Sequence, residues 1–111
     1  MRNFIQPGNT VTVTAPAAVA SGAGVLVGSI FGVAVRSAAS GADIDVDVLG
    51  VFDLPKATGA AWTQGVRIYW DDVSKNCTTT VGTNKLIGVA TAAALSGDTI
   101  GRVRLSGAFT L

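Results

Sequence analysis

The chain of 111 residues contains no histidine, and all seven of its acidic residues are aspartates. Histidine is the commonest general base and metal ligand, so its absence removes the side chain on which most catalytic and metal sites depend. Glutamate, a strong helix former, is therefore absent, and glutamine, another helix former, occurs only as Gln6 and Gln64. These absences argue against an enzyme and against a helical fold.

Cysteine is also scarce, because Cys77 is the single thiol of the chain. One thiol cannot form an internal disulfide, so the sequence does not require an oxidising compartment. A cysteine nucleophile needs a base beside it, and no histidine exists to serve. We therefore expect Cys77 to be a small buried side chain.

Charge is sparse and evenly balanced, with a formal net charge of +1 and basic residues scattered along the chain. No field of one sign draws the protein toward nucleic acid, so we expect no nucleic-acid partner. No charged residue occurs from Asn3 to Val35. Small domains bury only a modest fraction of their surface, so this stretch must face lipid, be a cleaved leader, or contact other protein.

The segment from Ala15 to Val35 is long enough to span a bilayer as a helix. Four glycines interrupt it, however, and a Thr/Val alternation with the period of a strand precedes it. A secretory leader would place its apolar core directly after a basic start, whereas Pro7-Gly8-Asn9 and that strand intervene. We expect no membrane partner, and we predict buried β-structure that is covered in part by another chain.

Valine, isoleucine and threonine are abundant, and 14 glycines supply turns. Branched side chains favour pleated sheets over helices, so the composition predicts an all-β fold. We expect a small barrel or sandwich of short strands, with an extended N-terminal arm over residues 1–8 and a single β-domain over residues 9–111. No tandem repeat and no linker is evident. Alternation predicts strands at 9–14, 24–35 (two strands folded about Gly28-Ser29, or one bent strand), 43–48, 51–54, 66–71, 77–81, 86–94 and 99–105.

Three positions in this pattern call for local interpretation. Gly50 breaks the run that begins at Asp43. The segment from Ala90 to Leu95 could be one helical turn, but six residues make a marginal helix, and we favour a continuing strand. Ile100 is out of phase with Val103, and a β-bulge at Gly101 would restore the phase.

Two groups of aspartates resemble metal or catalytic sites. Asp43, Asp45 and Asp47 alternate, but a calcium loop must turn so that its oxygens converge, whereas a strand spaces them about 7 Å apart along a flat face. We interpret them as a solvated strand face and expect no metal. Asp71 and Asp72 are adjacent, so on a strand they would point to opposite faces, and turn formation explains them better.

No phosphate-binding glycine motif occurs, and nothing orients a serine, threonine or lysine as a nucleophile. The sequence therefore predicts neither enzymatic activity nor a cofactor. Trp62 and Trp70 are expected in the core, with Trp70 on the same strand face as Ile68. Tyr69 shares the opposite, polar face with Arg67, where a contact role and simple exposure both remain open.

Four segments carry a resemblance to a known family through their order and spacing: NFIQPGNTVTVTAP, ASGAGVLVGSIFGVA, GVFDLPKATGAAWTQGVRIYWDD and NKLIGVATAAALSGDTIGRVRL. Together they extend from Asn3 to about Leu105, and they resemble the phage capsid cement, or head decoration, proteins. The resemblance implies a small β-barrel-like protein on the outer surface of the assembled head, made in the host cytoplasm, that clamps neighbouring major capsid subunits, often as a trimer. Some members have been labelled recombinase-like, but this sequence lacks the phosphate loop that such an ATPase needs.

The resemblance brings no catalytic residue with it, but it implies contact regions. The arm is expected to touch the major capsid protein through Arg2, Phe4, Ile5 and Pro7. Contacts between copies in a homo-oligomer are expected at Val25, Val27, Ile30, Phe31 and Tyr69. A tail or connector component built on the same small β-domain is the alternative.

Overall fold

The computed structural model describes residues 8–107 and residue 110. These residues contain strands and no helix, so the all-β prediction is confirmed, and none of the described segments could cross a membrane as a helix. The strands are β1 (Thr10–Thr14), β2 (Gly24–Val27), β3 (Ile30–Ala34), β4 (Asp43–Asp47), β5 (Leu49–Pro55), β6 (Arg67–Asp71), β7 (Asn76–Thr78), β8 (Lys85–Ala90) and β9 (Ile100–Ser106).

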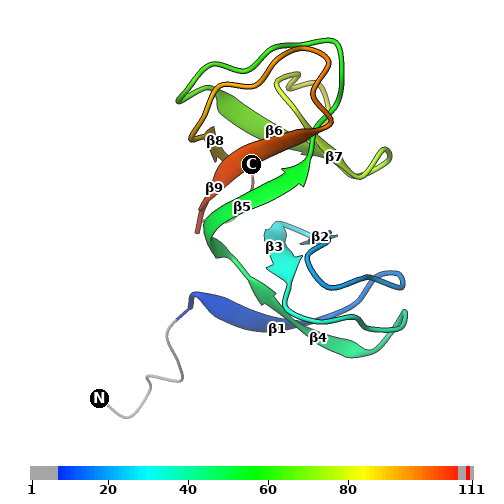
Figure 1. The fold of residues 1–111 in the computed structure, drawn as a ribbon. Helices are drawn as coiled ribbons and strands as arrows, with labels where there is room; N and C mark the ends of the chain where they lie inside the picture. Colours follow the sequence, from blue (N-terminus) through cyan, green and yellow to red (C-terminus); the bar gives the residue numbers. More distant parts are fainter. Residues whose placement is uncertain (1–7, 108–109, 111) are drawn as a thin grey trace.

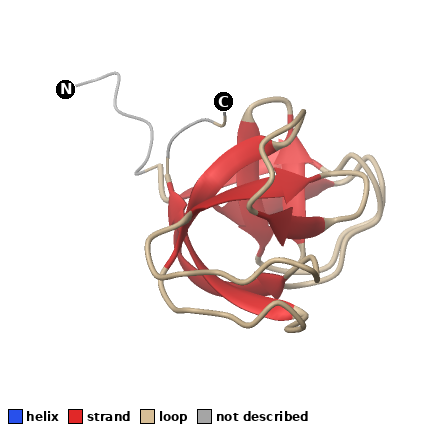
Figure 2. Ribbon diagram, turned by 90° about the horizontal axis from the view of Figure 1, so that it is seen from above, coloured by secondary structure: helices blue, strands red, loops and turns tan. Residues whose placement is uncertain are grey.

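The strands form two antiparallel sheets that follow each other along the chain (Figure 1). The first, here called the N-terminal lobe, has the order β1-β4-β3-β2. The second, here called the barrel lobe, has the order β5-β9-β8-β6-β7. A parallel bridge between Lys56 and Cys77 brings the end of β5 beside β7, so the two edges of the second sheet meet and the sheet curls toward a closed barrel. Seen from above, the strands wrap around a shared interior and the loops lie at the periphery (Figure 2).

Strict alternation determines which side chains fill the barrel. Ile68 and Trp70 of β6 are buried while Arg67 is exposed, and β9 buries Val103 and Leu105 while its two arginines are exposed. Burial of each large apolar side chain stabilises the fold by about 1.5–3 kcal/mol. The main core of this lobe comprises Leu54, Trp62, Ile68, Trp70, Cys77, Ile87, Ala90, Val103 and Leu105, so both tryptophans and the cysteine are buried as predicted.

A second and smaller core lies inside the N-terminal lobe. Ile44 and Val46 of β4 are fully buried there beside Val25, and the half-buried Val11 and Val13 of β1 pack against them. The remaining members are small, which makes this core thinner than that of the barrel: Ala15, Ala34 and the partly buried Val19, Val27, Ala38 and Val48.

The two lobes pack directly on each other. Phe31 and Val33 of β3 join the core of the barrel lobe, and the ring centroids of Phe31 and Trp70 are 4.9 Å apart. The chain passes from β4 to β5 through Val48, and the Thr110 N–H donates to the Ser29 carbonyl at 2.8 Å, tying the end of the chain back to the N-terminal lobe. The predicted fold of Gly24–Val35 about Gly28-Ser29 is confirmed as the β2–β3 hairpin.

The β-bulge predicted at Gly101 is wrong. β5 and β9 pair without a register shift from Leu49 and Ser106 to Pro55 and Ile100, so Ile100 points outward and Gly101 points into the barrel. A Cβ at Gly101 would overlap the six-membered ring of Trp62, which explains why a glycine stands there. The register shift of this sheet lies instead between β6 and β8, at Ile68 and Tyr69.

Two other local predictions also need correction. Gly50 does not break the strand pattern; it lies inside β5 with a φ of 137°, and the interruption falls at Val48. The strand predicted over 86–94 ends at Ala90, and the residues after it form neither a strand nor a helical turn. Ala94 makes an isolated bridge to Trp62 instead.

Candidate contact surfaces

The five residues predicted to contact other copies fall into three environments. Val25 and Phe31 are buried, with 3% and 5% of their surface exposed, so their side chains already have partners inside this chain. Val27 and Tyr69 are half-buried, and Ile30 is 41% exposed. The hairpin brings the four N-terminal residues together, whereas Tyr69 lies on β6 of the barrel lobe. Ile30 is therefore the member that offers the most surface to a partner.

The four residues predicted to contact the capsid lie outside the described residues, so the prediction for Arg2, Phe4, Ile5 and Pro7 is unchanged by the structure. The described chain begins at Gly8, which lines a hollow of about 180 Å³ together with Val11, Ser29, Ile30, Phe31, Val48 and Gly107. The arm thus joins the body next to Ile30. A second hollow of about 200 Å³ lies between the loop Pro16–Ala20, the edge of β2 and Trp70.

Each lobe contains a pair of loops joined by the same hydrogen bonds. Val19 and Ala38 exchange N–H···O bonds of 2.9 and 3.0 Å in the N-terminal lobe, and Trp62 and Ala94 do so at 2.8 and 3.1 Å in the barrel lobe. In three of the four turns, the glycine three residues after the bridging residue donates its N–H to a carbonyl of the facing segment: Gly22 to Ala34, Gly41 to Ala15 and Gly65 to Ala90. These three glycines have φ values of 83° to 89°, a region that other residues rarely adopt.

The sequence prediction of no tandem repeat missed this unit. Its signal is short: a small residue, the bridging residue, one variable residue, serine or glutamine, and then glycine, as in AVASG, SAASG, AWTQG and AALSG. Because the bridging residue ranges from alanine to tryptophan, the repeat is carried by backbone geometry and not by side-chain similarity. Apart from Arg36 and Asp98, the loops at residues 15–23, 35–42, 57–66 and 91–99 are uncharged.

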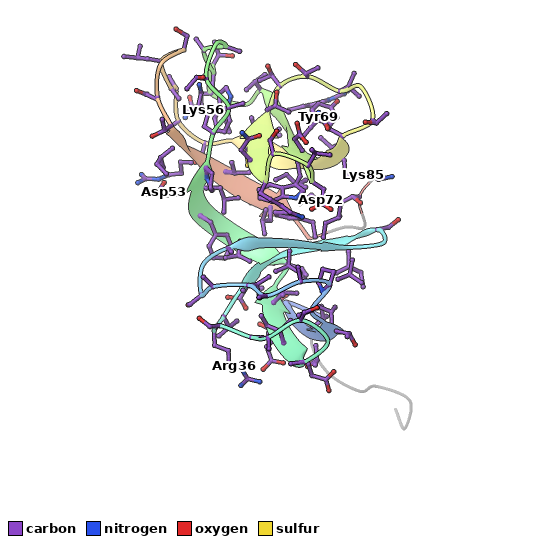
Figure 3. The ribbon with its side chains drawn as sticks, turned by 90° about the vertical axis from the view of Figure 1, so that its right-hand side faces the viewer. Arg36, Asp53, Lys56, Tyr69, Asp72 and Lys85 are labelled. Carbon is purple, nitrogen blue, oxygen red and sulfur yellow. The ribbon has the colours of Figure 1, made fainter. Side chains whose placement is uncertain are left out.

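Lys56 holds the loop pair of the barrel lobe together from inside (Figure 3). Its side chain is only 3% exposed, and its Nζ donates to the carbonyls of Ala57, Asp98 and Ser96 at 3.1, 3.4 and 3.5 Å. The Nζ also lies 5.7 Å from the centroid of the Trp62 ring, within the range of a cation–π interaction. A buried charge must be compensated in this way, so Lys56 is a structural residue and is not offered to a partner.

The outer face of the barrel lobe carries three arginines and exposed aliphatic residues. Arg102 pairs with Asp53, its Nε lying 3.0 Å from Oδ1. Hydrogen bonding to Arg102 lowers the pKa of Asp53 below its ordinary value, and the same bond raises the pKa of Arg102. Arg67 and Arg104 have no ion pair within the described part of the chain. These two arginines are therefore available for a charged partner.

The outer face of β1 and β4 is acidic and well ordered by side-chain bonds. The register pairs Thr10, Thr12 and Thr14 with Asp47, Asp45 and Asp43 respectively. The hydroxyls of Thr10 and Thr12 donate to Asp47 and Asp45, each at 2.6 Å. The aspartates lie along the strand, as the sequence predicted, and the described residues contain no group of three potential metal ligands.

The remaining candidates for chemistry have structural roles. Burial raises the pKa of the Cys77 thiol to about 12, so it stays protonated and is a poor nucleophile at neutral pH. Asp71 accepts from the N–H groups of Val73 and Ser74 at 3.0 and 3.1 Å, which confirms that it forms a turn. Asp72 accepts from Trp70 Nε1 at 3.1 Å and from Lys75 Nζ at 2.7 Å. These three side chains therefore serve the fold.

The chain matches a known sequence family. A sequence family described as phage cement protein matches residues 5–105, which includes every strand except the last residue of β9. No curated protein and no solved structure matches the chain.

Proposed function

We propose that this chain, which belongs to the phage cement protein family, is a structural component of the phage capsid. It binds the outer surface of the assembled head and stabilises contacts between major capsid subunits. The observation that carries this proposal is the extent of the match, from residue 5 to residue 105. Binding follows assembly, so the protein waits in the host cytoplasm until a shell is available.

Such a role requires adhesion at many equivalent points. A lattice presents the same patch repeatedly, so modest affinity per copy is sufficient when copies are linked in a symmetric oligomer. A protein that binds the assembled shell, and not its separate subunits, stabilises the shell by mass action. A stable contact of this kind buries about 1,000 Å² or more.

We assign the capsid contact to the arm, through Arg2, Phe4, Ile5 and Pro7. We assign contacts between the copies of a homotrimer to the hairpin and β6. Ile30, Val27 and Tyr69 supply exposed or half-buried surface there, while the buried Val25 and Phe31 support the hairpin from inside. This role requires no catalysis, and the Cys77 thiol, which stays protonated at neutral pH, is consistent with that.

The test is the temperature at which purified heads lose their DNA, measured with and without saturating protein. We expect the protein to raise that temperature. A variant lacking residues 1–7 serves as the matched control, and it should keep the circular dichroism spectrum of the full chain while binding heads at least about tenfold more weakly, equivalent to 1.4 kcal/mol.

Equal temperatures with and without bound protein would contradict stabilisation of the shell. Labelled protein found on the tail and absent from the faces of the head would contradict the location. Unchanged affinity of the shortened variant would leave the function standing and remove the arm as a capsid contact.

A further inference from the structure

The two lobes carry opposite net charge. Residues 9–48 contain one arginine and three aspartates, whereas residues 49–107 contain six basic and four acidic residues. Of the charged residues labelled in Figure 3, only Arg36 lies on the N-terminal lobe, and Asp53, Lys56, Asp72 and Lys85 lie on the barrel lobe. A protein with one negative and one positive lobe is electrostatically complementary to a second copy of itself.

The negative charge is concentrated on one sheet face. Residues paired across an antiparallel ladder point to the same side, so Asp43, Asp45 and Asp47 share with three threonines the face of β1 and β4 that points away from the small core, where Asp43 is exposed and Asp45 and Asp47 are half-buried. Neither strand contains a lysine or an arginine. The two Thr–Asp hydrogen bonds hold the carboxylates of Asp45 and Asp47 in place, so little side-chain freedom is lost when a cation meets them.

The positive charge of the barrel lobe also includes a sheet-face row. Arg67 is paired with Val89, Val89 with Arg104, and Arg104 with Val51, so the four side chains cross β6, β8, β9 and β5 on the outer face. Val51 is 52% exposed, and Val89 is half-buried. Two arginines without ion pairs in the described part of the chain therefore alternate with two valines along this row.

The dimensions of the two faces agree. Arg67 and Arg104 are two strand spacings apart, about 10 Å, and Asp43 and Asp47 are about 14 Å apart along β4. Both arginines thus fit within the span of the three aspartates. The methyl groups of the threonines beside those aspartates can cover Val89 and Val51 of the row.

We propose that the acidic face of β1 and β4 docks on the Arg67–Val89–Arg104–Val51 row of a second copy. The contact is head-to-tail, because each copy uses a different face on either side. A head-to-tail contact closes into a ring when its rotation permits, and three copies around an axis would satisfy every acidic face and every basic row. The arrangement rests on the proposed function and adds a charged contact between copies to the one assigned above to the hairpin and β6.

Charge reversal tests the interface by sedimentation velocity of the free protein at low and high salt. The wild type should self-associate, and more weakly at high salt because exposed charges are screened. Asp45→Lys and Arg104→Asp should each weaken association by about tenfold or more. Lys85→Glu changes the charge by the same amount as Arg104→Asp but lies outside the row. It should leave association unchanged.

The decisive sample combines the two reversals. The double variant Asp45→Lys/Arg104→Asp gives every altered face an oppositely charged row on the next copy, in a ring of three as in a pair, so association should return to near the wild-type level. Recovery cannot arise from misfolded protein. A wild type that stays monomeric at all concentrations would overturn the proposal, as would single reversals without effect or a double variant that fails to recover.

The outcome is separable from that of the proposed function. Wild-type protein that stabilises heads but ignores every charge reversal would remove this interface and leave the function. Protein that self-associates as described but never binds heads would preserve the interface and remove the function.

Discussion

Val19 and Trp62 occupy equivalent positions in the two loop pairs, yet one is half-exposed and the other is 2% exposed. The backbone bonds are matched, with each residue exchanging N–H···O contacts with an alanine on the facing loop. The difference lies in what each side chain reaches. Trp62 fills the barrel against Gly101, whereas Val19 lies at the border of a core made mostly of alanine and valine.

This contrast shows that one backbone device can support two kinds of lobe. The barrel lobe is stabilised by its own large side chains and by a buried lysine. The N-terminal lobe has a thinner core and borrows from the barrel through Phe31 and Trp70. The described part of the uncharged stretch, residues 8–35, is thus partly covered inside the chain, by the small core and by this contact.

The largest expected effect is a difference in stability between substitutions at the two bridging residues, Trp62 and Val19. Trp62→Ala should lower the free energy of unfolding by about 3–5 kcal/mol, because it leaves a large cavity in the barrel. Val19→Ala should cost only about 0.5 kcal/mol, since the side chain is half-exposed. Urea unfolding of both variants measures the difference, and similar losses would mean that the two loop pairs contribute equally to stability.

The next largest effect tests the close packing of Gly101 against the Trp62 ring. Gly101→Ala should cost about 1–3 kcal/mol, because its new methyl group overlaps the Trp62 ring. Adding Trp62→Phe should recover at least about 0.5 kcal/mol of the summed single losses. Gly97→Ala has open space and serves as the control. Strict additivity of the first two changes would show that Gly101 is not required by the ring.

The buried thiol is found in the barrel lobe only, so alkali should distinguish the lobes. The pKa of Cys77 is about 12 in the folded protein against an ordinary value of 9.0, so its stabilising effect is complete below pH 9 and is lost as the pH rises toward 12. Above pH 9 this group alone should lower the free energy of unfolding by about 1.4 kcal/mol per pH unit.

Cys77→Ala should remove that part of the slope while keeping whatever the tyrosine and lysines contribute. Urea unfolding at pH 8, 9 and 10 compares the two proteins. Parallel curves for wild type and variant would mean that the thiol is not buried from solvent as described.

The smallest effect concerns the exposed pair on the barrel face. Hydrogen bonding to Arg102 lowers the pKa of Asp53, so its contribution is present above the ordinary aspartate range and is lost as the pH falls through the lowered value. Because both side chains are exposed, Asp53→Asn should change thermal stability little at pH 7. An NMR titration of Asp53 in the wild type and in Arg102→Gln checks the direction, and an unshifted pKa in the wild type would rule out the pair in solution.

Period-2 alternation predicted most strands, because burial on one face leaves a clear pattern in segments such as RVRL and VRIYW. It did not reveal how Gly101 and Trp62 fit together, since that depends on two residues far apart in sequence. It also missed the loop repeat, whose common feature is hydrogen bonding by the backbone. Among the contact residues, hydrophobicity alone could not separate Phe31, which packs on Trp70, from Ile30, which points outward.

The backbone passes from β4 to β5, and so from one lobe to the other, at Val48, and this has a mechanical consequence. If separate neighbours pull on the two lobes as a pressurised shell strains, the covalent load runs through one extended residue. The tilted ring contact of Phe31 with Trp70 and the Thr110–Ser29 hydrogen bond share that load. The two lobes can therefore separate slightly at their contact before the hydrogen bonds within either sheet break.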